Sequence, residues 1–238
     1  MGGNKDSVFG YKDAVKRLRN QLQQLIYCII NPFVRLLIKL GITPNIVTTI
    51  GFLGNAFAAG LFVYAAETSS PDDFRYGTVL LAGVVIILFS LFDMLDGQVA
   101  RLGNMVSRFG AFYDSVLDRY SELLTLGGIC YYFFALGYRI SAGITFVAII
   151  GSIMVSYMRA RAEGLDIECK IGFMQRPERV VVTALGAIIC GWYGSVSVAP
   201  CFVPVYIMVG AVSIIAVFSN ITAIARLQLC RRVLKSRG

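Results

Sequence analysis

The chain has 238 residues, of which 57% are hydrophobic and 15% are charged, and its mean hydropathy is +0.70. This composition is too apolar for an ordinary soluble domain, so we expect an integral membrane protein. The formal net charge of +8 could suggest a nucleic-acid partner, but the basic residues lie mostly at the two ends of the apolar region, which indicates membrane topology and no nucleic acid.

Six apolar segments are long enough to cross a bilayer, which takes roughly 20 residues in a helix. They are residues 45–66, 76–99, 108–136, 140–161, 178–195 and 200–226. The sequence therefore predicts an all-α, polytopic membrane protein with six transmembrane helices over 45–226. We expect the whole chain, 1–238, to be a single domain.

Basic residues flank the predicted bundle on both sides. They are Lys5, Lys12, Lys16, Arg17, Arg19, Arg35 and Lys39 before it, and Arg226, Arg231, Arg232, Lys235 and Arg237 after it. The positive-inside rule therefore places both termini in the cytoplasm, and an even number of spans agrees. The loops expected on the other side carry only Arg75 and Arg139. We expect the protein in the cytoplasmic membrane, with its active site on the cytoplasmic side.

Residues 8–40 alternate basic and apolar positions at helical spacing, with an interruption at Pro32. This pattern favours an amphipathic helix that lies on the anionic cytoplasmic surface and contacts membrane lipids. A helix that packs against the bundle explains the same pattern, and the two interpretations are compatible.

The first predicted span begins with a break followed by helix-start residues. Thr43 is suited to cap the helix and Pro44 to its first turn. Asn45 and Thr48 then bring polar groups to the cytoplasmic end of the span. Capping alone explains this sequence, and a contribution to a ligand pocket is the alternative.

Four aspartates stand around the ends of the second and third spans. Asp93 and Asp96 are three residues apart, and Asp114 and Asp118 are four apart, so each pair lies on one face of its own helix. If the two faces converge, the carboxylates either protonate or hold divalent cations. Ligand sets made only of oxygen favour Mg²⁺ or Mn²⁺ over Zn²⁺. The chain contains no His, so an aspartate must serve as any general base.

The residues between and beyond the acid pairs have different expected roles. Gly97 lets a ligand approach the backbone, Ala100 keeps the same groove open, and Arg101 can meet a phosphate. This combination indicates a diphosphate held on metal. Arg119 and Glu122 are three residues apart on one helix, and we expect them to pair with each other without a catalytic role.

Basic residues gather again between the fourth and fifth spans. They are Arg159, Arg161, Lys170, Arg176 and Arg179, and Ser156 precedes them. Flanking charge under the positive-inside rule explains such a cluster. The alternative is a site for a second phosphate that is not on the nucleotide, because a short loop brings the ends of two helices together.

The run D-x2-D-G-x2-A-R-x8-G-x3-D-x3-D, from Asp93 to Asp118, resembles the signature of the CDP-alcohol phosphotransferases at all eight fixed positions. The resemblance covers nearly the whole chain and implies transfer of a phosphatidyl group from CDP-diacylglycerol with release of CMP. It also implies two Mg²⁺ or Mn²⁺ ions and a homodimer. The implied metal ligands are Asp93, Asp96, Asp114 and Asp118, and the implied nucleotide ligands are Asn45, Thr48, Asp93, Gly97, Ala100 and Arg101.

The basic stretch between the fourth and fifth spans resembles one subfamily more than the others. RARAE, followed by Q-R-x-E-R at the start of the fifth span, is similar to the phosphatidylinositol phosphate synthases, whose acceptor is inositol 1-phosphate. Gln175 departs from the pattern, which has Glu there. The residues implied to hold the acceptor phosphate are Ser156, Arg159, Arg161, Lys170 and Arg179.

The sequence leaves three functions to be weighed. The first is phosphatidyl transfer to inositol 1-phosphate or a similar phosphorylated polyol, in which Asp118 takes the proton of the attacking hydroxyl. The second uses glycerol 3-phosphate or another alcohol, and would make the protein a phosphatidylglycerophosphate synthase or another CDP-alcohol phosphotransferase. The third is a cation or proton transporter, because buried acids in membranes are often functional. Transport predicts acids near the bilayer midplane and does not need Gly97, Ala100 and Arg101.

Overall fold

The computed structural model describes residues 31–70, 73–196 and 203–237 of the chain. This part is helical, as predicted, and seven helices follow a short helix at residues 31–39. The seven are α2 (Pro44–Thr68), α3 (Tyr76–Ser90), α4 (Phe92–Leu102), α5 (Arg108–Ala135), α6 (Arg139–Glu163), α7 (Arg176–Val196) and α8 (Val203–Arg237).

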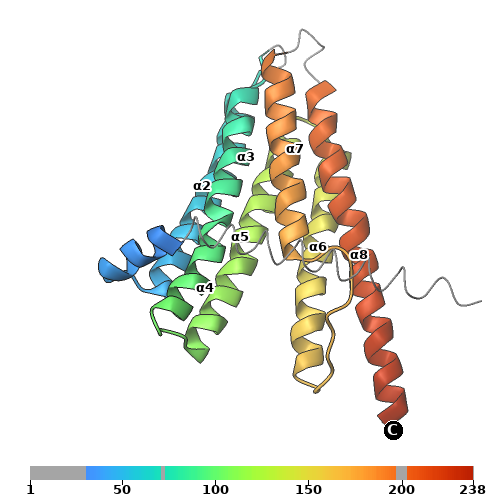
Figure 1. The fold of residues 1–238 in the computed structure, drawn as a ribbon. Coiled ribbons are helices and arrows are strands. Elements are labelled where there is room, and N and C mark those ends of the chain that lie inside the picture. Colours follow the sequence, from blue (N-terminus) through green and yellow to red (C-terminus); the bar gives the residue numbers. More distant parts are fainter. Residues whose placement is uncertain (1–30, 71–72, 197–202, 238) are drawn as a thin grey trace, which may run out of the picture.

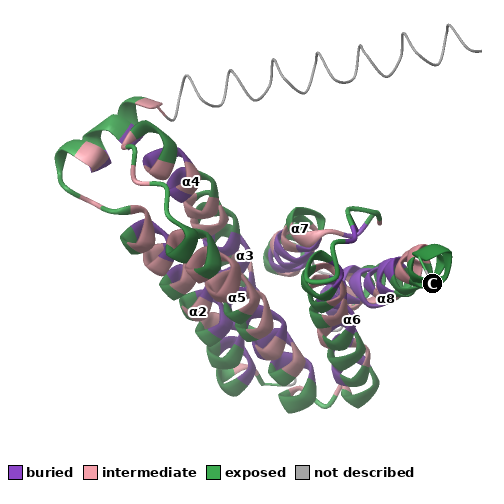
Figure 2. Ribbon diagram, turned by 90° about the horizontal axis from the view of Figure 1, so that it is seen from below, coloured by how far each residue is buried: buried purple, intermediate pink, exposed green. Residues whose placement is uncertain are grey.

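The helices form two groups that are joined along two seams. In the first group α2 packs on α3, α4 and α5, and in the second α8 packs on α6 and α7. The seams are the contacts of α3 with α7 and of α5 with α6. Figures 1 and 2 show the helices close together at the end where α7 finishes and spread apart at the other end, where α4 and the last turns of α6 lie.

Five helical segments of the described chain are long and apolar enough to cross a membrane: α2, α3 with α4, α6, α7 and α8. They correspond to five of the six predicted spans, and the protein is an integral membrane protein. The sixth predicted span, 108–136, is the 28-residue α5. It is less apolar because charged residues, Asp114 and Asp118 among them, occupy its first half.

Two helix boundaries differ from the prediction. The predicted span 76–99 is divided at Leu91 into α3 and α4. The last helix continues to Arg237, whereas the prediction ended at residue 226. Leucine and arginine are both good helix formers, and Leu229 packs on the buried Ile167 of the loop between α6 and α7. Packing therefore extends α8 beyond its apolar part.

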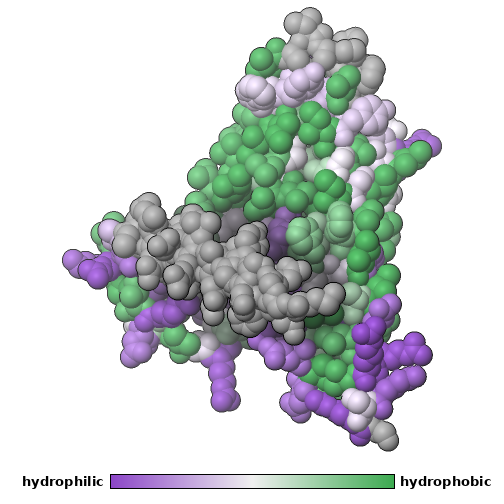
Figure 3. All heavy atoms as spheres, turned by 45° about the vertical axis from the view of Figure 1, so that its right-hand side comes forward, coloured by the Kyte–Doolittle hydropathy of each residue, from purple (hydrophilic) through white to green (hydrophobic). Residues whose placement is uncertain are grey.

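The outside of the helices is largely apolar. Large hydrophobic side chains such as Phe57, Ile150, Val181 and Ile221 are exposed. Figure 3 shows that hydrophobic atoms cover much of the upper face, while hydrophilic atoms gather at the lower end. Exposed apolar surface of this extent is rare in soluble proteins and is typical of helices that face lipid.

Only part of the predicted interfacial helix lies within the described residues. The prediction covered 8–40, of which 8–30 lie outside the described residues. The described part of this segment is helical from residue 31 to residue 39 and includes Pro32.

The helix at 31–39 has a packed face and an exposed face. Val34 and Leu37 are buried in a cluster with apolar residues of α2 and α4. Arg35, Leu36 and Lys39 are exposed. The structure therefore confirms packing against the bundle for this segment, and contact of its exposed face with the membrane surface stays a prediction.

Small residues allow the helix backbones to approach closely. A Cβ added at Gly128 of α5 would lie 2.8 Å from the carbonyl oxygen of Ala59 in α2. A Cβ at Gly191 of α7 would lie 2.3 Å from the backbone nitrogen of Leu80 in α3. Both helix contacts therefore require glycine, in the way that small residues bring membrane helices together.

We expect Gly128→Ala to destabilise the protein by about 1–3 kcal/mol, because the new methyl group must push α2 away from α5. Gly127→Ala is the matched control, since a Cβ there meets no atom within 4 Å, and alanine is the better helix former. Thermal unfolding of the two purified variants in detergent measures the difference. Equal melting temperatures would contradict the close contact of α2 and α5.

Candidate active site

The four predicted acids come together at the spread end of the bundle. Asp93 and Asp96 lie on α4, and Asp114 and Asp118 lie on α5. The charges of Asp93 and Asp96 each interact with Asp114, and that of Asp118 interacts with Asp93. The side chains of Asp93 and Asp118 are only 15% exposed. The two helix faces therefore converge, as their spacing predicted.

Arg176 stands between the two acid pairs. It is the first residue of α7, and one guanidinium nitrogen, Nη2, lies 2.9 Å from Asp93 Oδ2 and 2.7 Å from Asp118 Oδ1. Its Nε is buried and has no hydrogen-bond partner. The second helix group thus supplies a positive charge to the acids of the first group.

The donor chemistry of this site fits a hard divalent cation. All four acids offer carboxylate oxygens, and a cationic group already lies between Asp93 and Asp118. In the described residues, no three or more Cys, Asp or Glu side chains are arranged, as they stand, to hold a metal ion. Arg176 occupies the position between Asp93 and Asp118. The match to a metal site therefore rests on the four carboxylates as oxygen ligands and on the cationic group that already lies between two of them.

A first pocket opens on one side of the acids and has a volume of about 350 Å³. It is lined by Pro44, Asn45, Thr48, Asp96, Gly97, Ala100, Arg101, Met105, Val106, Ser107, Gly110, Ala111 and Asp114. We call it the nucleotide pocket, because it contains five of the six residues predicted to hold a nucleotide. The sixth, Asp93, does not line it.

Helices α2, α4 and α5 hold the nucleotide pocket together. The Thr48 hydroxyl donates to Asp96 Oδ2 over 2.6 Å. Gly110 packs closely here, because a Cβ there would lie 3.0 Å from Ser107 Oγ and 3.3 Å from Asn45 Oδ1. Thr43 is at the N-cap position of α2, but its side chain makes no capping hydrogen bond, so the predicted side-chain cap is wrong.

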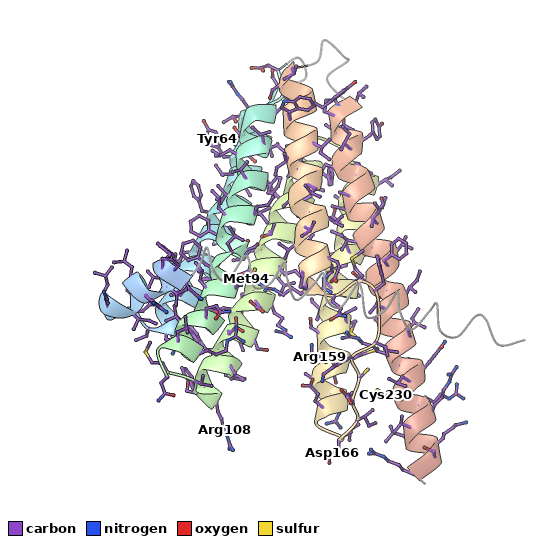
Figure 4. All side chains as sticks on the ribbon, in the orientation of Figure 1. Tyr64, Met94, Arg108, Arg159, Asp166 and Cys230 are labelled. Carbon is purple, nitrogen blue, oxygen red and sulfur yellow. The ribbon has the colours of Figure 1, made fainter. Side chains whose placement is uncertain are left out.

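A second pocket of about 510 Å³ lies on the other side of the acids. It is lined by Asp114, Ser115, Asp118, Arg119, Val155, Ser156, Arg159, Ala160, Glu163, Gln175, Arg176, Pro177, Arg179 and Arg226. We call it the basic pocket. Figure 4 shows Arg159 at the spread end of the molecule, on α6. Asp114 lines both pockets, so the acids separate two spaces of different character.

The basic pocket contains only some of the residues predicted to hold a second phosphate. Ser156, Arg159 and Arg179 line it, whereas Arg161 and Lys170 do not. Arg159 donates to Glu163 over 2.9 Å. Lys170 lies in the loop after α6 and pairs with Glu168 over 2.9 Å.

A family model described as CDP-alcohol phosphatidyltransferase matches residues 41–218. The chain belongs to this family. The match covers every residue that lines the two pockets except Arg226. The protein is therefore a CDP-alcohol phosphatidyltransferase family enzyme, of the kind that its signature between Asp93 and Asp118 indicated.

Two characterised relatives are similar over most of the chain. The phosphatidylinositol phosphate synthase of Mycobacteroides abscessus is 34% identical over 167 residues, which are 70% of this chain and 71% of that protein. The archaetidylinositol phosphate synthase of Pyrococcus horikoshii is 37% identical over 153 residues, or 64% of this chain and 72% of that protein.

Solved structures of a relative have the same arrangement of helices. The crystal structure of Mycobacterium tuberculosis phosphatidylinositol phosphate synthase with CDP-DAG bound has a TM-score of 0.71 and 29% identity. It covers 85% of this chain and 93% of that chain. The structure of the same enzyme with manganese and citrate has a TM-score of 0.69, covering 84% of this chain and 87% of that one.

In this CDP-alcohol phosphatidyltransferase, the predicted pair of Arg119 and Glu122 is wrong. Glu122 accepts hydrogen bonds from Nε and Nη2 of Arg179, which is 2% exposed. Arg179 Nη1 also donates to the carbonyl oxygen of Met174 over 3.1 Å. Arg119 instead donates to Ser115, one turn earlier on α5. Helix proximity favoured the local pair, but the buried guanidinium of α7 takes the carboxylate.

Two arginines of the site were not among the predicted site residues. Arg176 was noted only as a member of the basic cluster, because Asp93 is 83 residues away along the chain and the two become neighbours only in the fold. Arg226 reads as flanking charge in the sequence, yet it is 2% exposed. Its guanidinium donates to the carbonyl oxygens of Val155 at 2.6 Å and Ile171 at 2.9 Å. It thus ties α8 to α6 and to the loop after it.

We expect Glu122→Gln to cost about 3–5 kcal/mol of stability, because it leaves the buried Arg179 charge without its partner. Glu163→Gln is the matched control. It breaks the pair with Arg159, whose side chains are 44% and 55% exposed, and such a pair contributes about 1 kcal/mol or less. Thermal unfolding in detergent measures both. Equal effects of the two changes would show that the buried pair is not a main support of the fold.

Proposed function

We propose that this enzyme transfers a phosphatidyl group from CDP-diacylglycerol to inositol 1-phosphate, giving phosphatidylinositol phosphate and CMP. The observation that carries the proposal is the position of the acids between two pockets, with Asp114 lining both. A transferase needs a donor and an acceptor on opposite sides of its reacting centre. A cation transporter has no need of two such pockets.

The nucleotide pocket suits the CDP part of the donor. Gly97 and Ala100 leave room for a ligand beside α4, and Arg101 offers a guanidinium to a phosphate. Asn45 and Thr48 supply polar groups from α2. The CDP-DAG in the related M. tuberculosis structure supports this assignment.

We assign Asp93, Asp96, Asp114 and Asp118 as the ligands of two Mg²⁺ or Mn²⁺ ions. The manganese in the second M. tuberculosis structure supports the choice of metal class. When bound, such ions neutralise the diphosphate and the charge that grows on the departing CMP. The protein's part is to hold four carboxylates from α4 and α5 at the boundary of the two pockets.

The basic pocket suits an acceptor that carries a phosphate of its own. Ser156 and Arg159 come from α6, and Arg226 comes from α8. The relatives from M. abscessus and P. horikoshii, both inositol phosphate lipid synthases by name, support inositol 1-phosphate as the acceptor. We assign no role in this pocket to Arg161 or Lys170, because neither residue lines it.

The transfer is an in-line displacement. The acceptor hydroxyl oxygen bonds to the phosphorus that carries the diacylglycerol, and the bond from this phosphorus to the bridging oxygen of CMP breaks. Asp118 lines the basic pocket and takes the hydroxyl proton as the general base. CMP leaves with the bonding electrons, so a covalent intermediate with the enzyme is not needed.

The proposed topology has six spans in one domain, 1–238. α5 is the remaining span, because it packs along α2 and α6, and its charged half lies at the spread end with the acids. The diacyl chains of the donor then stay in lipid while its head group reaches the acids. We place this end, both termini and the site on the cytoplasmic side of the cytoplasmic membrane, and we propose a homodimer.

We expect purified protein with Mg²⁺ to release CMP from CDP-diacylglycerol when inositol 1-phosphate is present, and not with glycerol 3-phosphate, free inositol or serine. Asp118→Asn should reduce the rate at least about 100-fold, because it removes the general base and a metal ligand. Asp73→Asn is the control, since Asp73 is 67% exposed and far from the site. Release with glycerol 3-phosphate alone would make the protein a phosphatidylglycerophosphate synthase.

The basic pocket makes a further prediction about two exposed cations. Arg159→Gln should raise the KM for inositol 1-phosphate about tenfold, the loss of one charge-assisted phosphate contact. Lys170→Gln should change it less than about twofold, because Lys170 pairs with Glu168 outside the pocket. Steady-state kinetics at saturating CDP-diacylglycerol measures both values. Equal shifts would place the acceptor phosphate nearer the loop than the pocket.

A further inference from the structure

Arg176 occupies the position where the proposed function needs a metal ion. A single nitrogen, Nη2, contacts Oδ2 of Asp93 and Oδ1 of Asp118. These oxygens belong to two different helices, α4 and α5. The guanidinium therefore bridges the acids in the way that a bound cation would.

A metal ion and this arginine cannot use the same oxygens at the same time. A divalent ion bound by Asp93 and Asp118 needs the lone pairs that now accept from Arg176, and it repels a guanidinium at contact distance. The side chain is 24% exposed and its Nε has no hydrogen-bond partner. It is thus held mainly by the two carboxylates, and its Nε–H group makes no hydrogen bond.

The surroundings of Arg176 leave one direction for it to move. It lines a cavity of about 20 Å³, enclosed by α2, α3, α5 and α7, which holds about one water molecule and no guanidinium. It also lines the basic pocket of about 510 Å³. A displaced guanidinium therefore turns toward Ser156 and Arg159.

We propose that Arg176 is an exchangeable counter-ion of the active site. Before metal binds, it neutralises Asp93 and Asp118 and keeps α7 docked on α4 and α5. Metal binding displaces it into the basic pocket, where its guanidinium becomes an additional ligand for the acceptor's phosphate. This inference rests on the metal site and the acceptor pocket of the proposed function.

The exchange links two binding events. An ion that displaces Arg176 frees its guanidinium from Asp93 and Asp118 and makes that charge available in the basic pocket, so metal loading strengthens binding of the phosphorylated acceptor. By thermodynamic reciprocity, the acceptor strengthens metal binding by the same factor. The acceptor pocket is then fully assembled only when the metal ions needed for transfer are in place.

Direct measurement of Mn²⁺ binding tests the exchange without relying on turnover. The free Mn²⁺ signal in electron paramagnetic resonance is titrated with purified protein in lipid nanodiscs, in the absence of substrates. We expect Arg176→Gln to bind Mn²⁺ at least tenfold more tightly than the wild type. Arg159→Gln is the matched control, because it removes the same charge from the same pocket but has no contact with the acids, and its affinity should stay within twofold.

Isothermal titration with inositol 1-phosphate tests the second half of the inference. In the wild type, saturating Mn²⁺ should raise the affinity at least fivefold, and in Arg176→Gln this gain should fall below twofold. Both titrations are repeated with Arg176→Lys, in case the glutamine variant does not fold. A lysine amine cannot reproduce the planar guanidinium, so Mn²⁺ affinity should rise several-fold there too.

The outcomes separate this inference from the proposed function. Unchanged or weaker Mn²⁺ binding in both Arg176 variants, with normal binding in the wild type, would overturn the exchange and leave the metal site standing. An equal gain in Arg159→Gln would also overturn it, because the effect would then be general electrostatics. Absence of Mn²⁺ binding by the wild type would overturn the metal site itself.

Discussion

Burying several carboxylates at the edge of an apolar bundle is costly unless a positive charge lies close to them. Arg176 supplies such a charge to Asp93 and Asp118, and it reaches them from the other group of helices. The contact places the start of α7 beside the acids of α4 and α5, at the end where the helices are spread apart. Neither helix group contains a complete site, so packing of α3 on α7 and of α5 on α6 is also assembly of the active site.

The aspartates between the two pockets differ in which pocket they face. Asp114 faces both pockets, while Asp96 lines only the nucleotide pocket and Asp118 only the basic pocket. One turn of α5 therefore separates Asp114, which lines both pockets, from Asp118, which is the general base in the proposed mechanism. A rigid helix fixes this spacing better than a loop can, and the close contact at Gly128 holds that helix against α2.

Local patterns predicted much of this protein, and long-range contacts account for what they missed. Apolar length located the spans, and the spacing of the acids predicted that two helix faces converge. The pairing of Glu122 could not be predicted in the same way, because its partner Arg179 is 57 residues away along the chain. Arg226 looked like a flanking charge because its two carbonyl partners, Val155 and Ile171, become neighbours only in the folded bundle.

The contacts of Arg226 divide the chain into two parts with different constraints. All four acids and the whole nucleotide pocket precede residue 115 or lie within a turn of it, whereas α6, the loop after it and α8 build the far wall of the basic pocket. Arg226 links α8 to α6 and to this loop by hydrogen bonds to backbone carbonyl oxygens, which do not depend on the side chains of the loop. Substitutions in the later part of the sequence can therefore reshape the basic pocket without touching a residue that lines the nucleotide pocket.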